Sequence, residues 1–277
     1  MTRNDDDKRP SLVPAPGDIH PLRRFTDARV ALGRAGTSLP TRAHLDFLHD
    51  HARARDAVWA TPDLDGLGSR LESAGMPVVR LRSAAPDRAV YLRRPDLGRR
   101  LADEDAGRLR GLAVPEGAGG ERPRECQRVG IVVADGLSAM AIDVNAAPVV
   151  LGLGQALRDQ GLDVAPVALV EQGRVAIGDA IGEALGLALV IVLIGERPGL
   201  SAADSLGCYV TWAPRPGTPD SARNCVSNIR LGGLDPERAV ASIAALVQGI
   251  CRSRVSGVAL AAAAAAAAAA ERIRNSS

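Results

Sequence analysis

The chain has 277 residues, of which 46% are hydrophobic and 24% charged, and its net charge is +2. This composition is that of a folded globular protein with room for one large domain or two modest ones. Nearly balanced charge and only 2% aromatic residues argue against nucleic-acid binding, and we see no apolar run of the roughly 20 residues that cross a membrane. We therefore predict neither nucleic acid nor membrane as a partner.

The first part of the chain has mixed signals. Residues 1–20 are polar and rich in proline, which predicts a disordered arm. Residues 21–115 predict a mainly helical region that binds a partner. Its expected elements are a helix over 41–58 with Thr41 as N-cap, a helix over 63–74, a strand over 78–81 and a helix near 94–107.

A change of pattern separates the two halves of the chain. Residues 116–127 are rich in glycine, proline and charge and predict a linker, after which short apolar runs alternate with helical stretches. The expected strands are 129–133, 164–170, 188–194 and 209–212, and the expected helices are 146–160, 177–185 and 236–254. This alternation favours parallel strands, so we predict a Rossmann-like, doubly wound, mainly parallel sheet over 128–258. Residues 259–277 form an alanine-rich tail.

Unusual residues follow three of the predicted strands, in segments 135–139, 172–175 and 195–199. The carboxyl ends of parallel strands meet at one edge, where open α/β sheets bind ligands. Gly195 and Gly199 would permit a close approach of backbone to a bulky ligand. A carboxylate at position 196 needs a donor, and pairing of Glu196 with Arg197 across the turn is the alternative to a ligand-binding role.

The residues predict no catalytic or metal-binding group. There is no glycine-rich phosphate fingerprint of the nucleotide-binding type. His49 and His51 are two residues apart on a helix and therefore point to different faces. Cys225 has no base near it in the sequence. From the residues alone, the second half is a ligand-binding α/β domain.

Several unusual segments occur together in one order: DGLSAMA (135–141), GRVAIGDAIGE (173–183) and GERPGLSAADSLGCYVTWAPRPGTPDSARNCVSNIR (195–230). These segments closely resemble the small (light) subunit of ethanolamine ammonia-lyase, and the resemblance extends over residues 25–258. It implies a lyase subunit, inactive alone, that works with the large subunit in a hetero-oligomer containing equal numbers of both. The holoenzyme of that family converts ethanolamine to acetaldehyde and ammonia with adenosylcobalamin.

The resemblance also implies a cofactor site. Val175, Glu196 and Cys225 match the positions at which the family's small subunit contacts cobalamin, whereas the substrate chemistry belongs to the large subunit. No residue here is expected to bind cobalt, so the cofactor would keep its own benzimidazole ligand. The implied location is cytoplasmic, with a bacterial microcompartment as an alternative. Two other functions stay open: a stand-alone α/β hydrolase or transferase with Glu196 as base, and a non-catalytic adaptor.

Overall fold

The computed structural model describes residues 21–26, 28–112, 128–263 and 265. The helices are α1 (Thr41–Trp59), α2 (Leu64–Ser73), α3 (Arg88–Arg93), α4 (Asp103–Arg110), α5 (Ala139–Ala141), α6 (Ala147–Asp159), α7 (Ile177–Ala184) and α8 (Pro236–Ser253), with single turns at Pro21–Arg24, Leu97–Arg99, Ile142–Ala146 and Asp220–Ala222. The strands are β1 (Val78–Arg82), β2 (Arg128–Ala134), β3 (Asp163–Val164), β4 (Val167–Glu171), β5 (Leu189–Gly195), β6 (Leu206–Trp212) and β7 (Arg223–Ile229). The predicted arm and linker, and most of the predicted tail, lie outside the described residues.

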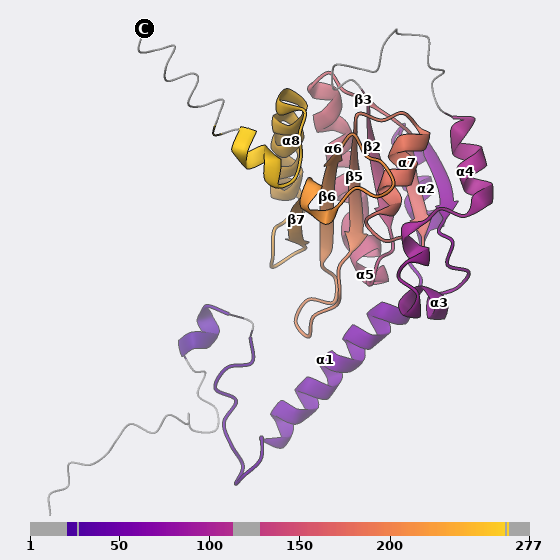
Figure 1. The fold of residues 1–277 in the computed structure, drawn as a ribbon. Helices are drawn as coiled ribbons and strands as arrows, with labels where there is room; N and C mark the ends of the chain where they lie inside the picture. The colour runs from indigo at the N-terminus through magenta and orange to yellow at the C-terminus, as the bar shows by residue number, and fades with distance from the viewer. Residues whose placement is uncertain (1–20, 27, 113–127, 264, 266–277) are drawn as a thin grey trace, which may run out of the picture.

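The strands form one seven-stranded sheet in the order β1-β4-β2-β5-β6-β7, with β3 also paired to β2 (Figure 1). β1, β4, β2 and β5 are parallel, β6 is antiparallel to β5, and β7 is antiparallel to β6. The predicted α/β class and mainly parallel sheet are therefore confirmed. β6 reverses because the connection 196–205 contains no helix, and parallel neighbours need a crossover of about a dozen or more residues.

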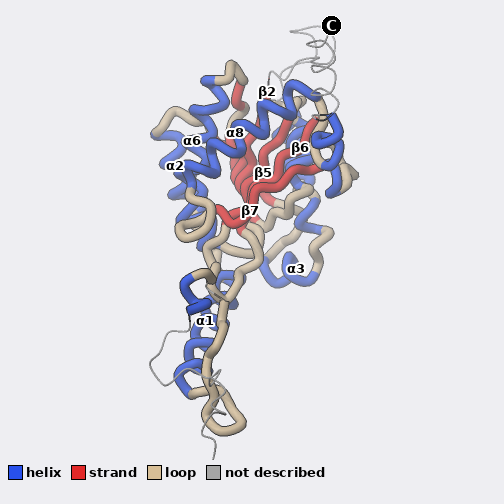
Figure 2. The backbone as a smooth tube through the Cα atoms, turned by 90° about the vertical axis from the view of Figure 1, so that its left-hand side faces the viewer, coloured by secondary structure: helices blue, strands red, loops and turns tan. Residues whose placement is uncertain are grey.

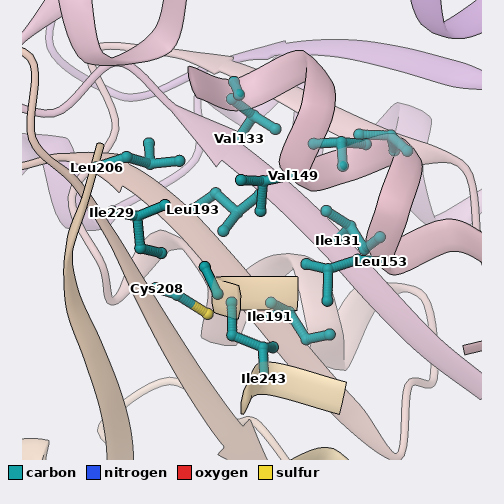
Figure 3. Close-up of a cluster of buried hydrophobic side chains, with 14 of the residues drawn as sticks. Ile131, Val133, Val149, Leu153, Ile191, Leu193, Leu206, Cys208, Ile229 and Ile243 are labelled. Carbon is teal, nitrogen blue, oxygen red and sulfur yellow. The ribbon is translucent and has the colours of Figure 1, made fainter. Parts of the chain in front are cut away.

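Apolar side chains cover both faces of the sheet, and Figure 2 shows the strands in the middle of the body with helices on either side. One face packs against α2, α6 and α8; in Figure 3 Ile191 and Leu193 of β5 lie near Val149 of α6 and Ile243 of α8. The opposite face packs against α7 and α4, and we call it the α7 face. Every residue of β5 is buried, as expected for a strand covered on both sides.

The sheet extends into the first half of the chain. β1 pairs with β4 in register from Val78 opposite Val167, and α2 packs Leu67 and Leu71 into the core of the sheet. The sequence predicted the strand but not its neighbour, because strand pairing is a long-range contact that local patterns do not encode. Residues 64–110 thus contribute to the same layered body, and the division into a helical region and a separate sheet domain stays a prediction.

Helix α1 projects away from the layered body in both views (Figures 1 and 2). Ala57, near its end, is its only buried residue. Pro40 occupies the N-cap position and no side chain caps the helix, so the prediction that Thr41 is the N-cap was wrong. The helix expected near 94–107 is also wrong in its bounds, because α4 begins only at Asp103. The helix α3, which ends at Arg93 just before Pro95, was not predicted.

The helical segment Ala139–Asp159 is longer than the sequence predicted, since the Ser138 hydroxyl caps it by accepting a hydrogen bond from the Ala141 N–H at 3.1 Å. By length and composition this segment could cross a membrane, a possibility that the sequence analysis missed. In the fold it lies against the sheet, and Val149, Leu153 and Leu157 are fully buried there. It therefore serves as a core helix.

Candidate functional site

The three predicted loops meet at the carboxyl end of the parallel strands, which we call the rim. The N–H of Leu137, after β2, donates to the carbonyl of Gly195 at the end of β5 at 2.9 Å. The N–H of Gly173, after β4, donates to Asp135 Oδ1 at 2.9 Å. The loop after β2 is thus bonded to its neighbour on each side, as the parallel topology predicts.

Two glycines allow this close contact between the loops. Gly136 has a φ of 56°, and a Cβ there would lie 2.2 Å from the carbonyl oxygen of Gly195. A Cβ on Gly195 would lie 2.3 Å from the carbonyl oxygen of Ser138. Gly195 is therefore required for contact between backbones of this chain, and its close approach to a ligand stays a prediction.

The half-buried carboxylate of Glu196 is held by a side-chain donor just before β6 and by a backbone donor in β7. Its Oε2 accepts from Ser205 Oγ at 2.5 Å and from the Asn228 N–H at 3.3 Å. Among the ion pairs of the described residues there is none between Glu196 and Arg197, so the alternative of pairing across the turn was wrong. Within the described residues the second oxygen, Oε1, accepts no hydrogen bond, so it is available to another donor.

Cys225 lies close to Glu196 on the α7 face. It stands opposite Tyr209 in the β6–β7 register, and side chains of directly opposed residues share a face. Burial raises the pKa of Tyr209 to about 12, and the Cys225 thiol and the Glu196 carboxylate add to the rise. Burial raises the pKa of Cys225 as well, despite its interaction with Tyr209. The phenol and the thiol are therefore mainly protonated near neutral pH, and the Cys225 thiol is less readily ionised than that of an unburied cysteine.

Val175 lies on the adjacent loop of the rim, between β4 and α7. It is half-buried and packs against the apolar cluster of the α7 face, as Tyr209 does. The structure thus groups Glu196, Tyr209 and Cys225 directly. Val175 is on the same face, in the loop after β4. That loop is held in place by the hydrogen bond from the Gly173 N–H to the Asp135 carboxylate.

Sequence analysis missed the ion pair that fixes β7 beneath α7. Arg223 donates from Nη1 and Nη2 to the two oxygens of Asp179 at 2.6 and 2.7 Å, and the side chains are 2% and 1% exposed. The same guanidinium donates to the Thr211 hydroxyl and the Thr218 carbonyl. An aspartate within the apolar run IGDAIGEA was the available signal. The pair sets the position of the strand that carries Cys225.

The sequence analysis also missed the buried contact between Arg88 and Asp135. Its Nη1 donates to Asp135 Oδ2 at 3.0 Å, and both side chains are largely buried. Burial raises the pKa of Asp135 to about 6, although Arg88 and the backbone N–H groups of Gly173 and Gln172 lower it. Asp135 therefore titrates close to neutral pH.

The raised pKa of Asp135 predicts a pH-dependent stability difference between wild type and Asp135→Asn. The folded-state pKa, about 6, is above the usual 3.8, so the stabilising effect is complete below about pH 4 and is lost as the pH rises through about 6. Relative to Asp135→Asn, the wild-type free energy of unfolding should increase by about 3 kcal/mol as the pH falls across this range.

Denaturant unfolding of both chains from about pH 7 to about pH 4 measures this difference. The matched control is Ser83→Ala, another buried polar residue near the rim, which removes no titrating group. Its stability difference from wild type should not vary with pH. A difference between wild type and Asp135→Asn that is constant over the range would contradict the prediction.

A cleft with a volume of about 1360 Å³ lies beside the rim. It is bounded by α4, α7 and the loop before β7, and Asp179 and Arg223 form part of its wall. Val175, Glu196 and Cys225 do not line it. The predicted site therefore lies outside this cleft.

Comparison with known proteins identifies the family. The family model described as Ethanolamine ammonia-lyase light chain (EutC) matches residues 17–261. The chain is 51% identical over 239 residues to the ethanolamine ammonia-lyase small subunit of Azotobacter vinelandii, and the match covers 86% of this chain and 86% of the relative. It is 48% identical over 260 residues to that of Ralstonia nicotianae, covering 94% of this chain and 93% of the relative. The chain belongs to the ethanolamine ammonia-lyase small-subunit family.

Proposed function

We propose that this lyase subunit holds adenosylcobalamin at the rim, together with the large subunit that its family name implies. The observation that carries the proposal is the grouping of Glu196, Tyr209 and Cys225 on the α7 face, with Val175 on the neighbouring loop. We also propose that the parallel strands and their covering helices form a Rossmann-like, doubly wound arrangement. In that arrangement ligands bind at the carboxyl ends of the strands.

The chemistry of these residues fits a corrin. Corrin amide side chains donate hydrogen bonds, and Glu196 Oε1 is an acceptor held in place by the bonds that its other oxygen makes. Val175 offers backbone groups and an apolar surface, and Cys225 is small, neutral and exposed. When bound, adenosylcobalamin supplies radical chemistry. This chain's residues bind and orient it.

We assign the substrate chemistry to the large subunit. In the rim loops 135–139, 172–175 and 195–199 the carboxylates are Asp135 and Glu196, and each is already bonded to donors of this chain. In the described part of the chain no group of three His, Cys, Asp or Glu residues could hold a metal ion. The four histidines of the chain, at positions 20, 44, 49 and 51, lie outside these loops, so we propose that no residue of this chain binds the cobalt.

Activity of the assembled enzyme tests the proposal. The full chain co-expressed with the large subunit should form acetaldehyde from ethanolamine only when adenosylcobalamin is present. The chain purified alone should form none. Turnover by the chain alone, or cofactor-independent turnover by the pair, would contradict the proposal and favour a stand-alone enzyme.

We propose that α1 docks on the large subunit. Leu45 and Leu48 lie one turn apart on this projecting helix and are 58% and 46% exposed. Trp59 is 55% exposed at its end, and Arg53 and Arg55 are exposed between them. Exposed leucine and tryptophan beside arginine are typical of a protein interface, and a large partner is implied by the family.

Charges introduced on α1 should therefore weaken assembly. Replacing both Leu45 and Leu48 by glutamate should lower the affinity for the large subunit about 100-fold, because the two side chains would no longer bury apolar surface. Co-purification of the tagged chain with the large subunit measures the effect. The matched control is Ala241→Glu with Ala245→Glu, two exposed positions one turn apart on α8. Equal recovery of the large subunit with both pairs would contradict a docking role for α1.

The assembly is proposed to contain equal numbers of both subunits and to be cytoplasmic, or enclosed in a bacterial microcompartment. Both the subunit ratio and the location are supported by the family resemblance, and not by the geometry of the rim. Native mass spectrometry of the co-expressed pair gives the subunit ratio, and an unequal ratio would contradict the proposal.

A further inference from the structure

Arg88 connects three parts of the fold through one buried guanidinium. Its Nε donates to the Val58 carbonyl near the end of α1 at 2.7 Å. Its Nη1 donates to Asp135 Oδ2, after β2, at 3.0 Å and to Gln172 Oε1, after β4, at 3.3 Å. The Arg88 side chain is 11% exposed and that of Asp135 4%. The end of α1 is thus bonded to two loops of the rim.

Both backbone groups of Gly173 are held by this cluster. The N–H donates to Asp135 Oδ1 at 2.9 Å, and the carbonyl accepts from the buried Tyr91 hydroxyl at 2.9 Å. The guanidinium carbon of Arg88 lies 4.9 Å from the centre of the Tyr91 ring, and that of Arg174 lies 4.3 Å from it. Gly173 is fixed two residues before Val175.

We propose that Arg88 and Asp135 are positioning residues that hold the loop 172–175 in place for the cofactor and tie it to α1. The inference rests on the proposed function, because that function gives the held loop its role. Neither residue is catalytic. If α1 docks on the large subunit, the same guanidinium connects the partner-binding helix to the cofactor loop.

The position requires an arginine. A guanidinium offers donors in a fixed planar fork and lies flat on an aromatic ring, so it reaches Val58, Asp135 and Gln172 from one place. A lysine carries its donors on a single nitrogen and cannot span all three acceptors. Removal of the side chain takes away the donor that orients the Asp135 carboxyl group and raises its pKa further, so the group becomes a neutral acid that holds the Gly173 N–H more weakly.

The complex of the full chain with the large subunit provides the test. Adenosylcobalamin is titrated into the complex and binding is followed by absorbance. Arg88→Met should raise the apparent Kd about 10- to 100-fold, with the size of the complex unchanged. The matched control is Arg128→Met at the opposite end of β2, where a 19% exposed arginine lies 3.4 Å from Asp163. Its apparent Kd should change less than about two-fold.

Two milder variants and a second readout separate positioning from general stability. Arg88→Lys and Tyr91→Phe should raise the apparent Kd about 3- to 10-fold, since each removes only part of the network. Hydrogen exchange of the Gly173 amide should be faster in all three variants than in wild type, and unchanged in Arg128→Met. If Arg88→Met does not assemble, these two variants decide the question.

The comparison with Glu196→Ala keeps the two proposals distinguishable. Normal cofactor affinity in Arg88→Met, Arg88→Lys and Tyr91→Phe together with weakened affinity in Glu196→Ala would overturn the positioning role alone. Normal affinity in all four variants would overturn the rim as the cofactor site, and this inference with it.

Discussion

Glu196→Ala should weaken adenosylcobalamin binding by the assembled enzyme about 10- to 100-fold, because a carboxylate acceptor is lost from the proposed cofactor surface. Its Oε2 also accepts from Ser205 and Asn228, so the variant loses the bonds that fix the acceptor. Absorbance titration of the complex measures the apparent Kd, and acetaldehyde formation at low cofactor concentration should fall in parallel. At saturating cofactor the rate should recover, since substrate chemistry is assigned to the large subunit.

The control for this prediction is Glu237→Ala, an exposed glutamate at the start of α8, away from the rim. It should leave cofactor affinity unchanged. Glu196→Gln should retain part of the binding, because an amide oxygen still accepts a hydrogen bond. A Glu196→Ala enzyme with wild-type cofactor affinity would remove Glu196 from the site.

Asp179→Asn should be the most destabilising of the substitutions that we predict. It leaves the Arg223 guanidinium, 2% exposed, without the carboxylate that it binds through two hydrogen bonds. Breaking a buried pair from one side costs about 3–5 kcal/mol. Because Arg223 begins β7, the variant should also weaken cofactor binding through Cys225. Denaturant unfolding measures the loss of stability.

The matched control replaces a second carboxylate that pairs with the Arg223 guanidinium. Asp220 also pairs with Arg223, at 3.3 Å, but its side chain is 89% exposed. Asp220→Asn should therefore cost less than about 1 kcal/mol. Replacing both Asp179 and Arg223 by apolar residues of similar size should recover much of the stability lost in Asp179→Asn. Equal stability losses for Asp179→Asn and Asp220→Asn would contradict the importance of the buried pair.

The elements that the sequence predicted well carry their signals locally. The run ALVIVLIG ends at a polar turn and matches β5, and Asp235 followed by Pro236 marks the start of α8, where the Asp235 carboxylate accepts from the Arg238 N–H. The convergence of the three loops could also be predicted, because parallel strands present their carboxyl ends at one edge.

What the sequence did not reveal depends on contacts between distant residues. β7 was missed because it is an edge strand with a polar, partly exposed sequence, RNCVSNI. Arg88 lies 47 residues from Asp135 along the chain, and Asp179 lies 44 from Arg223. No local pattern marks one arginine among many as the partner of a particular carboxylate. The residues that hold the rim together could therefore be found only in the fold.

Alkylation of Cys225 tests the central claim most directly. Its thiol is exposed on the α7 face, whereas Cys208 is buried and serves as an internal control. The assembled enzyme is treated with N-ethylmaleimide with and without adenosylcobalamin, and labelling is quantified by peptide mass spectrometry. If the cofactor lies on this surface, it should slow the labelling of Cys225 at least about 10-fold by covering the sulfur. Labelling of Cys225 at the same rate in both samples would contradict a cofactor site at this rim.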